Sequence, residues 1–236
     1  MSVYRKKYTL LSSDVDALQR LRLSRLFTML QEASIAHTTE LGMGREKTLD
    51  RGLLWIIAQQ AVRVERLPVY DEPVVLSSWP GVTMHLYFPR FYRLETAGGE
   101  LLTEGSALWA LMDRESRHII FPEEHGIHIE GETDPSDPPL PRLPRFPQAE
   151  EKGTFTVPYS YTDLNGHMNN TRYLDLAEDL MPPALRSKAP KRIEAEFSGE
   201  VGAGETMELN MSAAENEYYL SGSREKRLFR LHLCYT

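Results

Sequence analysis

A short polar segment, Asp163-Leu164-Asn165-Gly166-His167, carries the side chains of this sequence that are best suited to catalysis. An acid, an amide and an imidazole stand at alternate positions, and an apolar helical pattern begins shortly after them at Tyr173. A helix start offers free backbone N–H groups and the positive end of the helix dipole, which can stabilise a developing oxyanion. The imidazole can position water and transfer protons. The segment therefore predicts an oxyanion site with a proton-transfer group beside it.

The same residue types also have structural uses. Asp and Asn are common N-caps at the start of a helix, and a single His is often only a packed side chain. The isolated Asp-x-Asn-x-His pattern leaves both interpretations open.

An internal repeat favours the catalytic interpretation. A constant shift of 147 positions sets Thr9 on Thr156 and lays YTLLSSDVDALQRLRLSRLFTML over FTVPYSYTDLNGHMNNTRYLDLA without a gap. Asp16 matches Asp163, but Leu18 and Arg20 stand at the positions of Asn165 and His167. A purely structural requirement would tend to persist in both copies. One polar set in two copies is what a single active site in a duplicated fold would leave.

The elements that must position these residues follow the same order in both halves. Helical apolar spacing over 23–33 ends at Gly42, and the matching pattern over 173–181 is stopped by Pro182-Pro183. Strand patterns follow each helix, over 53–67, 74–79, 85–96 and 101–113, and over 193–201, 205–212, 217–223 and 227–235. Each half is thus predicted to be a strand, one helix and an antiparallel meander. This pattern indicates an α+β fold of double hot-dog type, in which each of two units wraps a helix in an antiparallel sheet.

Proline marks the boundary between the halves. Six of the 15 prolines fall between Pro135 and Pro147, and proline favours an extended connector because it fixes φ and cannot donate a ladder hydrogen bond. We therefore expect a first unit over 1–129, a linker over 130–150 and a second unit over 151–236.

Composition excludes several classes of protein. The 41% apolar content suits a globular core, and the net charge of −7 disfavours a nucleic-acid binder. Cys234 is the single cysteine, so a disulfide framework and a cysteine-based zinc site within the chain are excluded. The longest apolar run, Leu53 to Ala58, is far shorter than the roughly 20 residues of a membrane helix, and the first residues lack a secretory signal pattern. The sequence predicts a cytoplasmic protein without membrane contact, metal or other cofactor.

The segment DLNGHMNNTRYLDLAED resembles the signature of the acyl-ACP thioesterase family. LLWIIAQQAVRVERLPVYDEPVVLSSW, GSALWALMDRESRHIIFP and RLPRFP resemble that family's first-domain strands, the end of its first hot-dog unit and its interdomain linker. The likeness spans nearly the whole chain in the right order. It implies hydrolysis of fatty acyl-ACP to a free fatty acid and holo-ACP. Because the first unit has the larger apolar content and lacks the polar set, we expect it to house the acyl chain and the second unit to carry the catalytic residues.

The resemblance also implies the site. The family's functional positions fall on Asp163, Asn165, His167 and Glu200. The Asn165 amide suits oxyanion binding, His167 and Glu200 suit water positioning and proton transfer, and Asp163 would orient Asn165 or His167. Which of His167 and Glu200 is the base stays open. Plant members usually carry a cysteine after the glutamate, where this chain has Val201, so the departure argues against a thiol nucleophile.

Three other functions remain as alternatives: an acyl-CoA thioesterase, a hot-dog (R)-specific enoyl hydratase, and a non-catalytic acyl-thioester binding protein. A hydratase would also place an acid and a histidine at a helix entrance, but would not release a thiol. A binding protein would retain the intact thioester.

Acyl carrier protein is strongly acidic, and a partner with net charge −7 needs a local basic patch to attract it. The segment LRSKAPKRIE supplies Arg186, Lys188, Lys191 and Arg192, which lead into the strand before Glu200. We expect docking there, with Arg142 and Arg145 or the basic residues over 224–227 as competing patches. The sequence leaves open whether the protein is a monomer or a homodimer.

Overall fold

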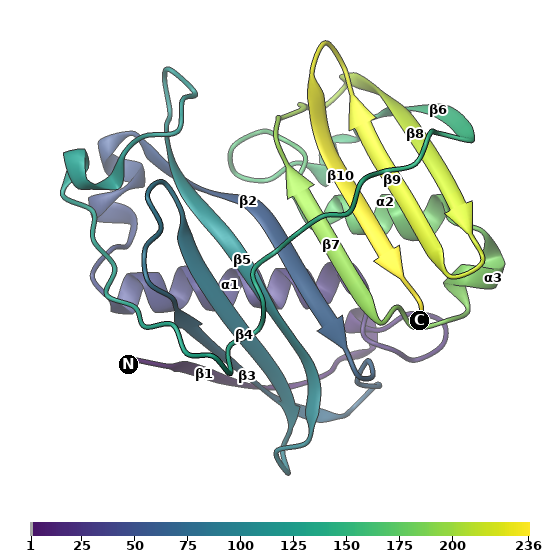
Figure 1. Cartoon of the computed structure of the whole chain (residues 1–236), viewed down its shortest axis with the longest axis horizontal. Coiled ribbons are helices and arrows are strands. Elements are labelled where there is room, and N and C mark those ends of the chain that lie inside the picture. The colour runs from purple at the N-terminus through teal and green to yellow at the C-terminus, as the bar shows by residue number, and fades with distance from the viewer. Residues whose placement is uncertain (1) are drawn as a thin grey trace.

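Ten strands form one continuous antiparallel sheet in the computed structural model, which describes residues 2–236 (Figure 1). The elements of the first half are β1 (Tyr4–Thr9), α1 (Leu23–Glu40), β2 (Leu53–Val64), β3 (Pro73–Pro80), β4 (Phe88–Thr96) and β5 (Leu101–Asp113). Those of the second half are β6 (Glu151–Thr156), α2 (Arg172–Leu180), α3 (Pro183–Arg186), β7 (Arg192–Phe197), β8 (Thr206–Ala214), β9 (Glu217–Ser223) and β10 (Arg227–Cys234). Short 3₁₀ turns lie at Ser12–Asp14, Arg45–Lys47, Leu49–Arg51, Pro122–His125 and Tyr159–Tyr161.

The strand order is β1-β3-β4-β5-β2-β7-β10-β9-β8-β6, so the second half repeats the first in mirror order around the β2–β7 pair. Gln60 of β2 lies opposite Ala195 of β7 at this join. In each half only three consecutive strands form a meander, β3, β4 and β5 in the first and β8, β9 and β10 in the second. The first strands after the helices, β2 and β7, pair with the last strands β5 and β10 instead. The predicted simple meander is therefore wrong for these two strands. Their place at the join leaves neither with an unpaired edge.

The structure confirms the repeat. β1 and β6 differ by 147 positions at both ends, as do the 3₁₀ turns Ser12–Asp14 and Tyr159–Tyr161. The helices differ because α1 has 18 residues and α2 has 9. Proline cannot supply the backbone N–H of a helix interior, so Pro182-Pro183 breaks the second helix, and α3 continues it as a separate short turn.

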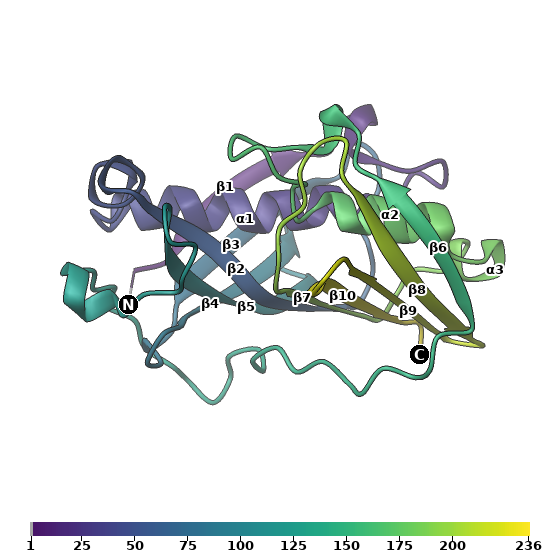
Figure 2. The ribbon, with the colours of Figure 1, turned by 90° about the horizontal axis from the view of Figure 1, so that it is seen from above.

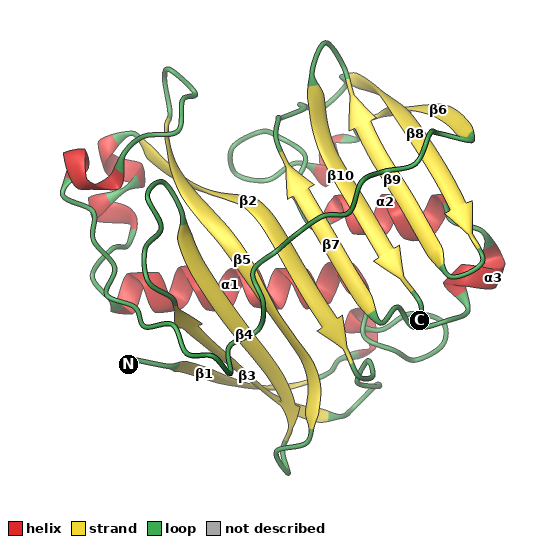
Figure 3. Cartoon of the chain, viewed as in Figure 1, coloured by secondary structure: helices red, strands yellow, loops and turns green. Residues whose placement is uncertain are grey.

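The helices lie on one face of the sheet, and the connector between the halves runs across the other (Figures 1 and 2). The core lies between the helices and the sheet, with Leu26 and Leu174 fully buried near the N-terminal ends of their helices. The connector is fixed to the outer face: Trp79 Nε1 donates to Asp137 at 2.9 Å, and Phe146 packs edge-on against Tyr219. Residues 130–150 contain neither helix nor strand (Figure 3). The three-part division of the chain stays a prediction.

Candidate active site

The Asp163–His167 segment is a tight turn rather than the first turn of a helix, since α2 begins at Arg172. The Asp163 carboxylate accepts the Asn165 backbone N–H at 2.7 Å, and the Asp163 N–H donates to the His167 carbonyl at 2.9 Å. Gly166 has φ +80°, which a residue with a side chain rarely adopts. Asp163 therefore shapes the turn, and we find no contact between its carboxylate and the imidazole among the described residues.

The turn is fastened to the loop that carries Glu200. Met168 donates its backbone N–H to the Val201 carbonyl at 2.8 Å, and His167 forms a β-bridge with Gly202. The Val201 side chain is fully buried. These backbone contacts bring the imidazole and the Glu200 carboxylate together although they are 33 positions apart in sequence.

Glu200 lies between two cationic or potentially cationic groups. Its Oε1 is 3.6 Å from Nδ1 of His167, and its Oε2 forms an ion pair with the Arg117 guanidinium. About a third of each of these three side chains is exposed, at 37% for Glu200, 34% for His167 and 33% for Arg117. A gap of 3.6 Å is slightly too long for a direct hydrogen bond, so both groups can face a water that lies beside them.

The symmetric positions of the first half separate structural from site-specific residues. The Asp16 carboxylate accepts the Leu18 backbone N–H at 2.9 Å, as Asp163 accepts that of Asn165. The loop after β2 matches the loop after β7: Leu21 donates to Pro68 O as Met168 donates to Val201 O.

Through this match Leu67 stands for Glu200, while Leu18 and Arg20 stand for Asn165 and His167. The aspartate of the turn is kept in both halves because both need the turn. The amide, the imidazole and the glutamate occur in the second half alone.

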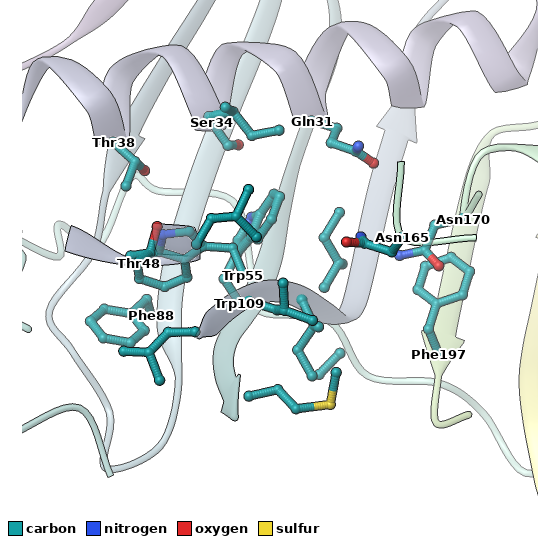
Figure 4. Close-up of a pocket in the computed structure, with 18 of the residues that line it drawn as sticks. Gln31, Ser34, Thr38, Thr48, Trp55, Phe88, Trp109, Asn165, Asn170 and Phe197 are labelled. Carbon is teal, nitrogen blue, oxygen red and sulfur yellow. The ribbon is translucent and has the colours of Figure 1, made fainter. Parts of the chain in front are cut away.

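Some of the backbone N–H groups at the helix start, which the sequence predicted to bind an oxyanion, already donate hydrogen bonds within the protein. The Thr171 N–H donates to the Asn169 side chain at 2.9 Å, and the Arg172 N–H donates to the Asn169 carbonyl at 2.9 Å. The Asn165 and Asn170 side chains lie at the same end of the cavity as Gln31 of α1 (Figure 4). Sequence reasoning missed Arg117, Gln31 and Asn170: Arg117 lies in a turn after β5, and its sequence neighbours carry no signal that it reaches Glu200.

A cavity of about 730 Å³ extends from the polar set along α1. Trp55, Phe88 and Trp109 form its apolar wall, and the first two pack edge-on with ring centres 4.9 Å apart (Figure 4). Most of the apolar lining comes from the first half, whereas the second half contributes the turn, Phe197 and Glu200 at one end. Such a volume is typical of a small-molecule site.

A second, basic cleft of about 480 Å³ adjoins this end of the cavity. Arg45, Arg114 and Arg117 line it together with Asn165. Arg45 forms an ion pair with Asp50 at 2.8 Å. Arg114 is exposed and has no ion-pair partner within residues 2–236. The cleft thus has an uncompensated positive charge beside the candidate site.

The basic segment expected to dock a partner lies elsewhere. Arg192 begins β7 and Phe197 ends it, so strand geometry places Arg192 roughly 17 Å from the end that leads to Glu200. Arg186 donates to the carbonyls of Asp179 and Met181, and Lys191 donates to that of Glu65. The expectation that this segment lies near the site is wrong, because β7 separates the two.

Burial raises the pKa of Tyr173, and the negative charge of Glu200 adds to this effect. Its ring packs against Phe197 and Phe229 beneath the site. Its phenol therefore stays neutral in the working pH range and offers no base. Cys234 lies at the last position of β10 and is not part of the cavity wall.

In the described part of the chain, no cluster of three or more His, Cys, Asp or Glu side chains could hold a metal ion. The helices over residues 2–236 include none that is long and apolar enough to cross a membrane.

Two family models match the chain. The acyl-ACP thioesterase N-terminal domain matches residues 1–124, and the acyl-ACP thioesterase C-terminal domain matches residues 146–228. A chloroplastic acyl-[acyl-carrier-protein] hydrolase of Cuphea viscosissima is 24% identical over 245 residues, which covers 97% of this chain and 59% of that protein. This chain thus spans about three fifths of the length of such curated relatives.

Solved structures share the fold. An acyl-ACP thioesterase from Bacteroides thetaiotaomicron superposes with a TM-score of 0.87 at 21% identity, covering 100% of both chains. The 12:0-ACP thioesterase from Umbellularia californica gives 0.84 at 18% identity, covering 99% of this chain and 97% of the other. These similarities confirm the α+β double hot-dog fold.

Proposed function

Because the chain belongs to the acyl-ACP thioesterase family, we propose that it hydrolyses the thioester of fatty acyl-ACP to a free fatty acid and holo-ACP. The observation that carries the proposal is the position of the polar set. Asn165, His167 and Glu200 lie together at one end of an apolar cavity, and the symmetric positions of the first half hold Leu18, Arg20 and Leu67.

The reaction needs an activated water and a donor for the oxyanion. Glu200 takes a proton from the water that attacks the thioester carbon, and the carbonyl oxygen becomes an oxyanion that the Asn165 amide stabilises. The C–S bond of the tetrahedral intermediate then breaks, and the proton on Glu200 passes to the departing thiolate. His167, with Nδ1 3.6 Å from Glu200, helps to hold the water that lies beside the two groups. This assigns the base, which the sequence left open, to Glu200.

Two further residues position this set. The ion pair with Arg117 fixes the Glu200 carboxylate on the side away from His167. Asp163 holds the turn that presents Asn165, through the hydrogen bond to its backbone N–H. We therefore assign Asp163 a positioning role.

The acyl chain occupies the cavity of the first half. Trp55, Phe88 and Trp109 provide its apolar wall, and the catalytic set stands at the end from which a thioester would enter. Replacing Phe88 by Ala is expected to move the preferred acyl length upward while hydrolysis continues, because the wall recedes without touching the polar set.

Acyl carrier protein docks at the basic cleft rather than at the Arg186–Arg192 segment. Arg114 lies beside the site, is exposed and has no ion-pair partner in the described chain, so an acidic partner gains from reaching it. Arg114→Glu should raise KM for acyl-ACP, more at low salt than at high salt, and leave hydrolysis of a short uncharged model thioester almost unaffected. Lys188→Glu is the matched control at the predicted but distant segment.

Thiol release from a panel of acyl-ACP and acyl-CoA substrates of graded length tests the activity directly. Asn165→Ala and Glu200→Gln are expected to lower kcat by about 10²-fold or more. Leu18→Ala, at the symmetric and exposed position of the first half, should leave kcat unchanged.

Each other outcome identifies a different function. Faster turnover of acyl-CoA than of acyl-ACP at every length would make the protein an acyl-CoA thioesterase. Hydration of an enoyl thioester without thiol release would make it a hydratase, and tight retention of intact acyl-ACP would make it a binding protein.

A further inference from the structure

A buried arginine forms part of the wall of the acyl cavity. Arg90 belongs to β4, lines the cavity, and is 3% exposed. Burial lowers its pKa to about 10, which still leaves the guanidinium charged at neutral pH. A charged group is rarely buried without a partner of opposite charge.

The protein supplies Arg90 with few partners. Its Nη2 donates to the Ser34 backbone carbonyl at 3.1 Å, and its Nε is buried without a hydrogen-bond acceptor. No carboxylate pairs with it within residues 2–236. The neighbouring polar groups are already engaged: the Tyr92 hydroxyl lies 2.7 Å from the Ser34 hydroxyl and accepts from Trp109 Nε1 at 3.3 Å.

The other titratable groups near Arg90 do not balance its charge. Burial, with a contribution from the charge of Arg90, lowers the pKa of His37 to about 4, so this fully buried imidazole is neutral at pH 7. Glu32 lines the cavity but lies on the exposed side of α1, and Glu200 stands at the catalytic end.

Arg90 lies deeper in the cavity than the catalytic end. Along α1, Gln31 is close to Asn165, and Ser34 and Thr38 follow at increasing distance from it (Figure 4). The hydrogen bond to Ser34 places the guanidinium along this inner stretch. A plain hydrocarbon chain would pass or end against a charged group with an unmet donor, which is unfavourable.

We propose that the cavity selects acyl chains whose distal part carries an oxygen acceptor, a hydroxyl or a carboxylate, to which the Arg90 guanidinium donates. The inference rests on the proposed thioesterase function and specifies its substrate class. A carboxylate would supply the missing negative charge and accept two parallel hydrogen bonds, and a hydroxyl would accept one.

The test compares acyl thioesters of one length that end in methyl, hydroxyl or carboxylate. We expect the wild-type protein to hydrolyse at least one oxygenated substrate with a kcat/KM about tenfold above that of the methyl substrate, since a buried donor left unpaired is costly. Arg90→Met should remove this preference. Arg93→Met is the matched control, because Arg93 lies on the same strand but on the outer face, where it donates to Ser136 O.

Two results would overturn the inference: no preference for either oxygenated end in the wild-type protein, or an unchanged ratio in Arg90→Met. If Arg90→Met shifts only the preferred length of methyl-ended chains, Arg90 is merely the end wall of the cavity. If the wild-type protein releases no thiol from any substrate, the proposed function fails instead. In that case calorimetry, which compares the binding of the free hydroxy acid, the dicarboxylic acid and the plain fatty acid, decides the role of Arg90 without catalysis. If Arg90→Met does not fold, the comparison of the three substrates with the wild-type protein decides.

Discussion

Replacing Asp163 distinguishes a positioning role from a chemical one. Asp163→Ala removes the acceptor of the Asn165 backbone N–H, a 2.7 Å hydrogen bond at an exposed position. A hydrogen bond to a charged group contributes about 1.5–3 kcal/mol, and exposure reduces this to about 1 kcal/mol. Loosening the turn by that amount predicts a loss of roughly five- to tenfold in kcat/KM. Removing a proton-transfer group would instead cost about 10²–10⁴-fold.

Asp163→Asn sharpens the test because the amide oxygen can still accept the same N–H and keep the turn. We expect Asp163→Asn to retain activity within about threefold of wild type, since the acceptor survives and only the charge is lost. The assay is steady-state thiol release from acyl-ACP, with the melting temperature of each variant measured in parallel.

The symmetric aspartate provides the control. Asp16 accepts the backbone N–H groups of Leu18 and Arg20, both at 2.9 Å, and also pairs with the Arg20 guanidinium. Asp16→Ala should therefore cost about 2–3 kcal/mol of stability and leave kcat unchanged. If Asp163→Asn is as inactive as His167→Ala while its melting temperature is unchanged, the Asp163 charge takes part in the chemistry and the positioning argument fails.

Three further predictions follow from particular residues. Burial and the nearby charge of Asp175 raise the pKa of Glu178 from 4.5 to about 7, so the protonated Glu178 stabilises the fold fully below pH 4.5 and this contribution is lost as the pH rises through 7. In urea titrations the free energy of unfolding of Glu178→Gln should exceed that of wild type by about 2 kcal/mol at pH 8.5 and by little at pH 5. An equal difference at both pH values would contradict the burial argument. Cys234→Ser should keep near-full thiol-release activity, because this thiol lies outside the cavity; substrate-protected inactivation by alkylating it would show otherwise. Arg117→Met should lower kcat about tenfold or more with KM nearly unchanged, since it frees the Glu200 carboxylate; a change in KM alone would place Arg117 in substrate binding instead.

The sequence alone was enough for the two-unit architecture and for the location of the polar segment before the second helix. Apolar spacing marked both helices, and the 147-residue shift already paired Asp16 with Asp163, because the two turns have the same local hydrogen bonds. Short-range patterns of this kind are legible in sequence since the interacting groups lie within a few residues of one another. Glu200, in contrast, was identified through resemblance, because a turn carboxylate has no local pattern that marks it.

Only the tertiary structure shows which residues far apart in sequence lie next to one another. Arg117 and Glu200 are 83 positions apart and meet because the turn after β5 and the loop after β7 lie at the same end of the joined sheet. The same topology places the Arg186–Arg192 segment, where docking was expected, at the opposite end of β7 from the site. In the sequence, Arg90 is one polar residue within a strand pattern. Only the packing of β4 against α1 shows that its charge is buried in the cavity wall. The distance between two residues in sequence does not show whether their loops lie at the same end of a sheet. When both faces of a sheet are covered, it also does not show which strand residues point toward the helices.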